Sequence, residues 1–351
     1  MFKKITGIAI LLASTTSFVT AQEERTSEPL QVSGSVDTYY KYDFAKSPNI
    51  GTYFANENNS VSLGMIDLAL KKTTGKASFV GELSFGPRGQ SQSIPNADGE
   101  YDELTNSFHI QNLYVNYALT DKFTMTAGYM GTFVGYEVIS PVANVNYSTS
   151  YLFGSGPFQN AGIKGTYAFS PKASLMVGLF NDWNLYQDFN GVSHIGAQLM
   201  VAPVEGWSAY LNVLSGFSAG ANGTGTIIDL TTSYQITSEF KLGLNAADYS
   251  ISDDNGGYSG VALYPQYAIT PGFILGARGE YFKSKVNSSF FTPGDESVVS
   301  LTLSGNLKSG GLTFIPEIRF DNSSSDQMFL NESLAPTKSA AQFSLAAVYA
   351  F

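Results

Sequence analysis

The chain has 351 residues, and only 14% of them are charged, whereas soluble domains usually carry about 25%. It contains no cysteine, which excludes disulfides, zinc–thiolate sites and thiol catalysis. The formal net charge of −10 argues against a nucleic-acid partner, because binding to phosphates requires basic patches.

The N-terminus has the order of a secretory signal peptide. Lys3 and Lys4 precede an apolar run that is too short to span a bilayer as a helix, and a stretch of small residues ends at Ala21. We therefore predict a signal peptide over residues 1–21, a short periplasmic tail over residues 22–30 and one domain over residues 31–351.

The rest of the chain is predicted to be all-β, because apolar and polar residues alternate along many segments. Between residues 32 and 44 the even positions suit lipid, and the odd positions are mostly Ser, Asp or Lys. Residues 77–85, 228–236 and 299–307 repeat this pattern. A soluble sandwich is the alternative, but about sixteen such segments of ten or so residues favour a transmembrane antiparallel up-and-down β-barrel.

The expected strands follow the alternation, with fourteen or eighteen strands as alternatives to sixteen. The alternation changes phase near Ile66 and near Asn112, which predicts either β-bulges or a register error there. The expected strand segments are 31–44, 59–72, 77–87, 107–119, 123–135, 158–169, 173–184, 192–203, 206–216, 224–236, 239–250, 258–269, 272–285, 296–308, 311–322 and 338–351.

The connections between these segments are of two kinds that alternate along the chain. Short ones carry turn residues, and longer polar ones cover residues 45–58, 88–106, 136–157, 253–257, 287–295 and 322–337. Short periplasmic turns opposite long extracellular loops are typical of outer-membrane barrels. The acidic stretch 98–103 is either ordinary solvated charge or a collector of cations that bridge lipopolysaccharide.

The last residues alternate as well, with large apolar side chains at Phe343, Leu345, Tyr349 and Phe351. A strand that ends on an exposed Phe would promote aggregation in water, whereas in a closed membrane barrel it pairs with the first strand. This ending resembles the C-terminal signal of bacterial outer-membrane barrels. The resemblance implies that Tyr349 and Phe351 guide insertion by the barrel-assembly machinery.

A barrel of about sixteen strands leaves an aqueous channel, so its inward positions should be solvated. Arginine and glutamate at i, i+2 spacing predict either a field across the pore that selects polar solutes or a structural ladder of ion pairs. The expected pore-lining residues are Asp37, Lys41, Glu82, Lys164, Asp229, Lys241, Arg278, Glu280, Glu317, Arg319 and Asp321.

The loop of residues 136–157 is unusually rich in apolar and aromatic residues for a surface loop. We predict that it folds into the lumen and narrows the pore, and a packed lid on the outer rim is the alternative. The residues expected to form this constriction are Glu137, Asn144, Asn146, Tyr147 and Tyr151.

Several runs resemble a known family over essentially all of the mature chain. These runs are Phe85-Gly86-Pro87-Arg88-Gly89-Gln90, Gln111-Asn112-Leu113-Tyr114-Val115, Gly135-Tyr136-Glu137-Val138-Ile139, Asn146-Tyr147-Ser148-Thr149-Ser150-Tyr151-Leu152-Phe153 and Gly156-Pro157-Phe158. They are similar to the putative β-barrel porin-2 (OmpL-like) family of Gram-negative bacteria, familiar from the Bacteroidetes. The resemblance implies an outer-membrane barrel that acts as a porin, without naming a solute.

Two other classes of outer-membrane protein are alternatives to a porin. An enzyme would need a histidine or paired carboxylates beside a nucleophile or water, but His109 and His194 lie on separate expected strands and in no known motif. A closed barrel with an adhesive or structural role would present loops 88–106 and 322–337.

We therefore expect a porin of the bacterial outer membrane that passes small hydrophilic solutes or ions passively and is not an enzyme. No cofactor and no metal are expected. The expected partners are outer-membrane lipid and lipopolysaccharide, the assembly machinery and the solutes. Sixteen-stranded porins commonly form trimers, so a homotrimer is one of the possible assemblies. The acidic composition favours a mild preference for cations.

Overall fold

A computed structural model describes residues 27–351 apart from residues 52, 91–108, 189 and 289. The predicted signal peptide and the acidic stretch 98–103 lie outside the described residues. The strands that build the wall are β1 (Gln31–Asp43), β2 (Ser60–Thr74), β3 (Ala77–Phe85), β4 (His109–Thr120), β5 (Phe123–Gly131), β6 (Gln159–Ser170), β7 (Ala173–Phe180), β8 (His194–Val201), β9 (Trp207–Gly216), β10 (Gly225–Gln235), β11 (Phe240–Ile251), β12 (Gly257–Thr270), β13 (Phe273–Ser284), β14 (Ser297–Ser309), β15 (Leu312–Ser323) and β18 (Ser339–Ala350).

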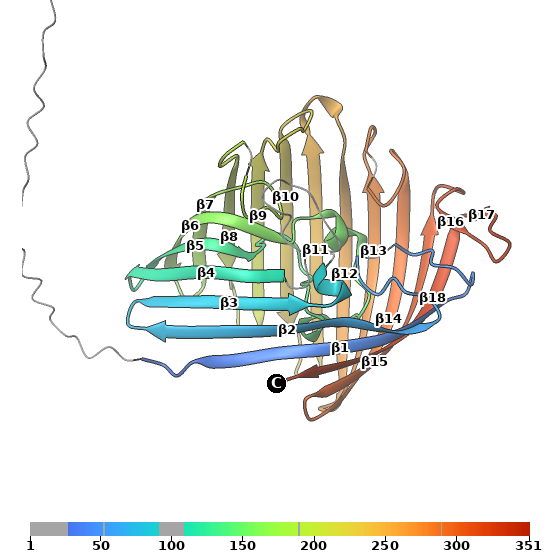
Figure 1. The fold of residues 1–351 in the computed structure, drawn as a ribbon, viewed down its shortest axis with the longest axis horizontal. Helices are drawn as coiled ribbons and strands as arrows, with labels where there is room; N and C mark the ends of the chain where they lie inside the picture. Colours follow the sequence, from blue (N-terminus) through green and yellow to red (C-terminus); the bar gives the residue numbers. More distant parts are fainter. Residues whose placement is uncertain (1–26, 52, 91–108, 189, 289) are drawn as a thin grey trace, which may run out of the picture.

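These sixteen strands form one closed antiparallel barrel, in which neighbours in sequence are neighbours in the sheet (Figure 1). β18 pairs with both β15 and β1 and thereby closes the wall. Phe351 extends the closing pair, because its backbone N–H donates to the carbonyl of Gly34 at 3.0 Å. Closure leaves no strand edge unpaired, which a membrane interior requires. The predicted fold class and strand count are confirmed.

Both predicted phase changes are β-bulges. Between β1 and β2 the register shifts from Val36 opposite Ile66 to Thr38 opposite Leu63. Between β3 and β4 it shifts beside Asn112. An extra residue on one strand moves the following side chains to the opposite face of the sheet. In the sequence this is seen as a change of phase in the alternation of apolar and polar residues.

The two faces of the wall differ as the alternation predicted. On β14, Val299, Leu301 and Leu303 are exposed on the outer face, whereas Ser300 and Thr302 are buried on the inner face. Similar exposed apolar side chains cover most of the outer wall. An apolar outer face of this kind is typical of barrels that lie in a membrane.

The remaining elements are short and lie in the long connections between strands. They are α1 (Pro87–Gln90), η1 (Pro141–Ala143), α2 (Tyr151–Ser155), η2 (Ser252–Asp254) and the small sheet of β16 (Phe329–Leu330) and β17 (Pro336–Thr337). Across the described part of the chain, helices fall short of the length and apolarity needed to cross a membrane.

Two strands end well before their expected ends, because the chain leaves the wall early. β5 ends at Gly131 rather than at residue 135, and the backbone N–H of Gly135 donates to Asp229 of β10 at 3.0 Å. β7 ends at Phe180 rather than at residue 184. At this end of the barrel, inward contacts of loop residues replace the pairing between strands.

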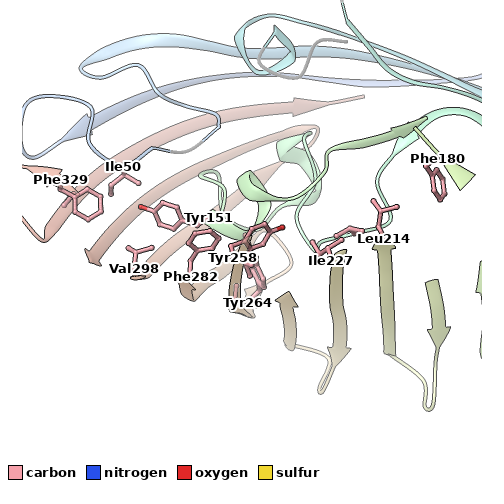
Figure 2. Close-up of a cluster of buried hydrophobic side chains, with 14 of the residues drawn as sticks. Ile50, Tyr151, Phe180, Leu214, Ile227, Tyr258, Tyr264, Phe282, Val298 and Phe329 are labelled. Carbon is pink, nitrogen blue, oxygen red and sulfur yellow. The ribbon is translucent and has the colours of Figure 1, made fainter. Parts of the chain in front are cut away.

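The inner face is apolar at the long-loop end, which the alternation of polar and apolar residues did not predict. Phe180, Leu214, Ile227, Tyr258 and Phe282 are fully buried there and belong to one cluster. Figure 2 shows them in a row along the strand ends, with Tyr151 of a connecting segment beside Phe282. These positions are apolar because loop residues pack on them instead of water.

The wall contains a glycine that no other residue should replace. Gly128 of β5 has φ +136°, and a Cβ atom there would lie 2.3 Å from the carbonyl oxygen of Leu113. We expect Gly128→Ala to lower the free energy of unfolding by about 1–3 kcal/mol, since both the backbone angle and the contact are strained.

Urea titration of the refolded protein in lipid vesicles, followed by tryptophan fluorescence, measures this loss. The matched control is Gly81→Ala on the nearby strand β3, where a Cβ atom meets nothing within 4 Å. Equal unfolding midpoints for the two variants would contradict the assignment of strain to Gly128.

Candidate functional site: the inward segment and the lumen

Residues 132–158 join β5 to β6 and lie inside the barrel, and we call them the inward segment. Tyr147 and Tyr151 are each only 1% exposed although they belong to a connection between strands. Asn144 stabilises a local turn in the segment. Its Oδ1 accepts a hydrogen bond from the N–H of Val138, and its Nδ2 donates one to the carbonyl of Val138. Ser150 then caps α2 by accepting from the N–H of Phe153 at 3.0 Å.

Carboxylates of the wall accept hydrogen bonds from the backbone of the inward segment. Glu317 of β15 accepts from the N–H of Tyr147 at 2.7 Å and from that of Ser148 at 3.1 Å. Glu280 of β13 accepts from the N–H groups of Tyr151 and Leu152 at 3.0 and 2.8 Å. Charge-assisted bonds of this kind are stronger than neutral ones, so they hold the segment against this wall.

Two buried arginines bind the segment from the same wall. Arg278 Nη1 donates to Glu137 Oε1 at 2.7 Å and to the carbonyl of Ser148 at 2.6 Å. Arg319 donates from Nη1 to the carbonyl of Thr149 at 2.7 Å and from Nε to Asp321 at 2.9 Å. Each guanidinium therefore has a buried carboxylate beside it, as a desolvated charge requires.

Phenol and amide side chains of the segment also donate hydrogen bonds to side chains of the wall. Tyr147 Oη donates to Asp37 and Tyr151 Oη donates to Asp321, each at 2.5 Å. Burial raises the pKa of the Tyr147 phenol well above its usual range, so the phenol remains a donor. Asn146 Nδ2 donates to Ser304 Oγ at 2.7 Å.

Arg88 was missed by the sequence interpretation, which placed it in a surface loop. It lies in α1 and is buried, with its guanidinium 4.4 Å from the ring centre of Phe54 and 4.9 Å from that of Tyr147. Its Nη1 donates to the carbonyl of Ile139 at 3.1 Å. The signal in the sequence was its place in one of the runs that carry the family resemblance, because three of these runs meet here.

The opposite side of the lumen is open and polar. One cavity of about 450 Å³ is lined from strands β5, β6, β8, β9 and β10 and by the start of the inward segment. An adjoining cavity of about 400 Å³ is lined from β4, β5 and β6. Lys164, Gly131 and Thr132 line both cavities. The barrel interior is thus divided into a packed side and an open side.

The sequence matches the family model of the putative beta-barrel porin-2, OmpL-like, over residues 29–351. The chain belongs to this family. It is therefore an outer-membrane barrel of the porin type, and its short turns are periplasmic and its long loops extracellular. The predicted family and the predicted location in the bacterial outer membrane are confirmed. A search among curated proteins found no match to the chain.

Solved structures of outer-membrane proteins share the fold of this family member. The anion-selective porin from Comamonas acidovorans has a TM-score of 0.63 at 12% identity, over 93% of this chain and 100% of that one. The outer membrane channel DcaP of Acinetobacter baumannii has a TM-score of 0.61 at 12% identity, over 93% and 97%. OmpT of Vibrio cholerae, in its trimer form, has a TM-score of 0.59 at 13% identity, over 93% and 99%.

The barrel divides the predicted pore-lining residues of this porin-2 chain into two groups. All of them lie on inward-facing positions of the wall. The residues that are buried, mostly beneath the inward segment, are Asp37, Lys41, Asp229, Arg278, Glu280, Glu317, Arg319 and Asp321. The residues that remain partly exposed on inward positions are Glu82, Lys164 and Lys241.

The remaining residues named in the sequence analysis lie away from the lumen or are packed against loops. His194 is buried at the long-loop end, with Nδ1 2.8 Å from Ser193 Oγ and 3.4 Å from Asp182 Oδ1, as a loop-packing histidine would be. Tyr349 and Phe351 are exposed on the outer wall. Among the described residues, histidines and carboxylates do not gather in groups of three or more that could hold a metal ion.

The ion pair of Arg278 and Glu137 offers a test of how the inward segment is held. We expect Arg278→Met to lower the free energy of unfolding by about 3–5 kcal/mol, because Glu137 is then left as an unpaired buried charge. Proteolysis should also cut the inward segment faster.

The control is Lys46→Met, which removes an exposed ion pair to Glu332 of 3.0 Å and should leave the unfolding midpoint unchanged. Thermal unfolding in detergent and limited proteolysis are the measurements. An Arg278→Met protein as stable and as resistant as the control would show that this pair does not anchor the segment.

Proposed function

We propose that this outer-membrane porin lets small hydrophilic solutes and ions diffuse passively through the open side of its lumen. A barrel of sixteen strands is wide enough to leave an aqueous channel. The observation that carries the proposal is that polar cavities, which share Lys164, run along one wall beside the inward segment. Passive diffusion needs no catalytic residue, which agrees with the buried, loop-packing position of His194.

We further propose that the inward segment constricts the channel. Its tip, Pro141 to Val145, reaches the short-turn end, where it lines a cavity of about 410 Å³ together with Lys308, Gly310 and Gly311. The segment therefore extends along most of the lumen instead of covering only its mouth. In this proposal the covered charges, such as Arg278 and Glu317, position the segment, and Glu82, Lys164 and Lys241 line the path.

A closed structural or adhesive barrel is a second candidate, and one observation favours it. Loop residues such as Ile50, Tyr151 and Phe329 join the apolar cluster at the extracellular end and cover part of the mouth. Further contacts between loops would close the mouth completely. The two candidates differ in a single measurable property, which is ion conduction.

The proposed partners follow from the same surfaces. The exposed apolar wall contacts outer-membrane lipid and lipopolysaccharide, and the barrel-assembly machinery recognises the strand that ends in Tyr349 and Phe351. A homotrimer is supported by the trimer form of the Vibrio cholerae protein of similar fold.

Single-channel recording of the purified, refolded protein in a planar bilayer tests conduction. We expect stable open steps whose conductance rises with salt concentration, because the open side of the lumen is polar and holds water. Folding is checked beforehand by heat-modifiable gel migration. Folded protein without any steps would exclude the porin and support the closed barrel.

Deleting Ala143 to Ser150 tests the constriction. We expect single-channel conductance to rise by about twofold or more, because the segment no longer fills one side of a bore of this width. The control deletes Gly220 to Asn222, a mostly exposed tip of another long loop at the same end of the barrel. A conductance equal to that of the control would mean that the inward segment does not limit the flow.

A further inference from the structure

The charges that remain accessible in the lumen differ in sign from those of the whole chain. The chain has a net charge of −10. On inward positions of the described strands, however, the partly exposed or exposed charges are mainly lysines, such as Lys164, Lys241 and Lys308. This matters for any solute that crosses the barrel, as proposed above, because a pore responds to the charges that line it and not to the net charge.

The inward carboxylates are largely occupied by other groups. Glu280 and Glu317 accept backbone N–H groups of the inward segment, and Asp321 pairs with Arg319. Asp229 is buried and accepts from Asn212 at 2.7 Å and from Asn245 at 2.5 Å. These negative charges are compensated and shielded by protein, so they exert little attraction on an ion in the open part.

One carboxylate remains partly exposed on the open side. Glu82 of β3 accepts from Asn112 Nδ2 at 2.5 Å. Its neighbour Asp67 is buried and accepts from the hydroxyl of Ser35 at 2.6 Å. Neither residue lines the two cavities beside Lys164. The carboxylates of this wall therefore do not neutralise Lys164 by a direct contact.

Lys164 occupies the middle of the open wall. It lies halfway along β6, opposite Thr126 of β5 and Gly178 of β7. Within the described residues it forms neither an ion pair nor a side-chain hydrogen bond, so its ammonium group is free to bind a solute.

The groups around Lys164 suit a small anion that carries hydroxyl or carboxyl oxygens. Ser208 and Thr231 line one of the cavities with hydroxyls that can donate hydrogen bonds. The amides of Asn112, Asn116 and Gln198 add polar surface, although they already donate to Glu82, Ser78 and Phe133. Tyr114, Tyr136 and Tyr210 add aromatic faces with polar ends. An unpaired cation among neutral donors, between low-dielectric walls, concentrates anions locally.

We infer that the open lumen selects small hydrophilic anions, carboxylates or phosphate, and that Lys164 is their binding residue. This inference rests on the proposed porin function and specifies its solutes. It reverses the mild cation preference that composition alone favoured. The reason is that the structure removes most carboxylates from contact with water and leaves Lys164 accessible.

Reversal potentials measured across a potassium chloride gradient test the selectivity. We expect the wild-type channel to pass chloride in preference to potassium. Lys164→Glu should lower the chloride-to-potassium permeability ratio by about threefold or more, and Lys164→Gln should lower it less. The matched control is Lys122→Gln, which removes the same charge from an exposed periplasmic turn beside the same wall.

Inorganic phosphate distinguishes binding at Lys164 from a general field effect. Added phosphate should reduce the chloride current of the wild-type and Lys122→Gln channels, and it should do so much less in Lys164→Gln. A wild-type channel that prefers potassium, or a Lys164→Gln channel unchanged in both ratio and block, would overturn the inference while leaving the porin standing. Folded protein without open steps would instead refute the porin function itself.

Discussion

The structure depends on one constraint, which is that a chain segment inside a barrel must find partners for its backbone N–H groups. Glu280 and Glu317 supply these partners to residues 147–152, and Arg278 and Arg319 bind carbonyls from the same stretch. Carboxylates and guanidiniums alternate along β13 and β15, on either side of β14, so this wall offers acceptors to the N–H groups of the segment and donors to its carbonyls. The charges seen in the wall are therefore needed to order the segment.

This packing makes the barrel asymmetric. The middle of the inward segment, residues 145–152, lies against β1 and β13 to β15, which leaves the wall from β4 to β10 beside polar cavities. Near the extracellular end an apolar cluster that includes Tyr151 and Phe282 supports the segment. Direct bonding to the wall and apolar packing thus hold the segment on one side, and the other side remains for water and solutes.

The same asymmetry separates structural charge from functional charge. A charge that is fully buried and paired contributes to order, whereas a charge that faces water acts on ions that pass by. Arg278 belongs to the first kind and, in the channel proposed above, Lys164 belongs to the second, although both occupy inward positions of barrel strands. Net charge and strand alternation do not distinguish these two residues, so neither property predicts the selectivity of the proposed channel.

The sequence by itself determined the barrel. Strand positions, the bulges beside Ile66 and Asn112 and the lipid-facing wall follow from an alternation of period two and from turn residues, which are local properties. Only the tertiary structure decided that Arg88 is buried, that Ile227 and Leu214 face inward and that Lys164 stays accessible. The path of the inward segment sets these features through contacts such as that of Tyr147 with Glu317, 170 residues apart, and no local pattern encodes such a contact.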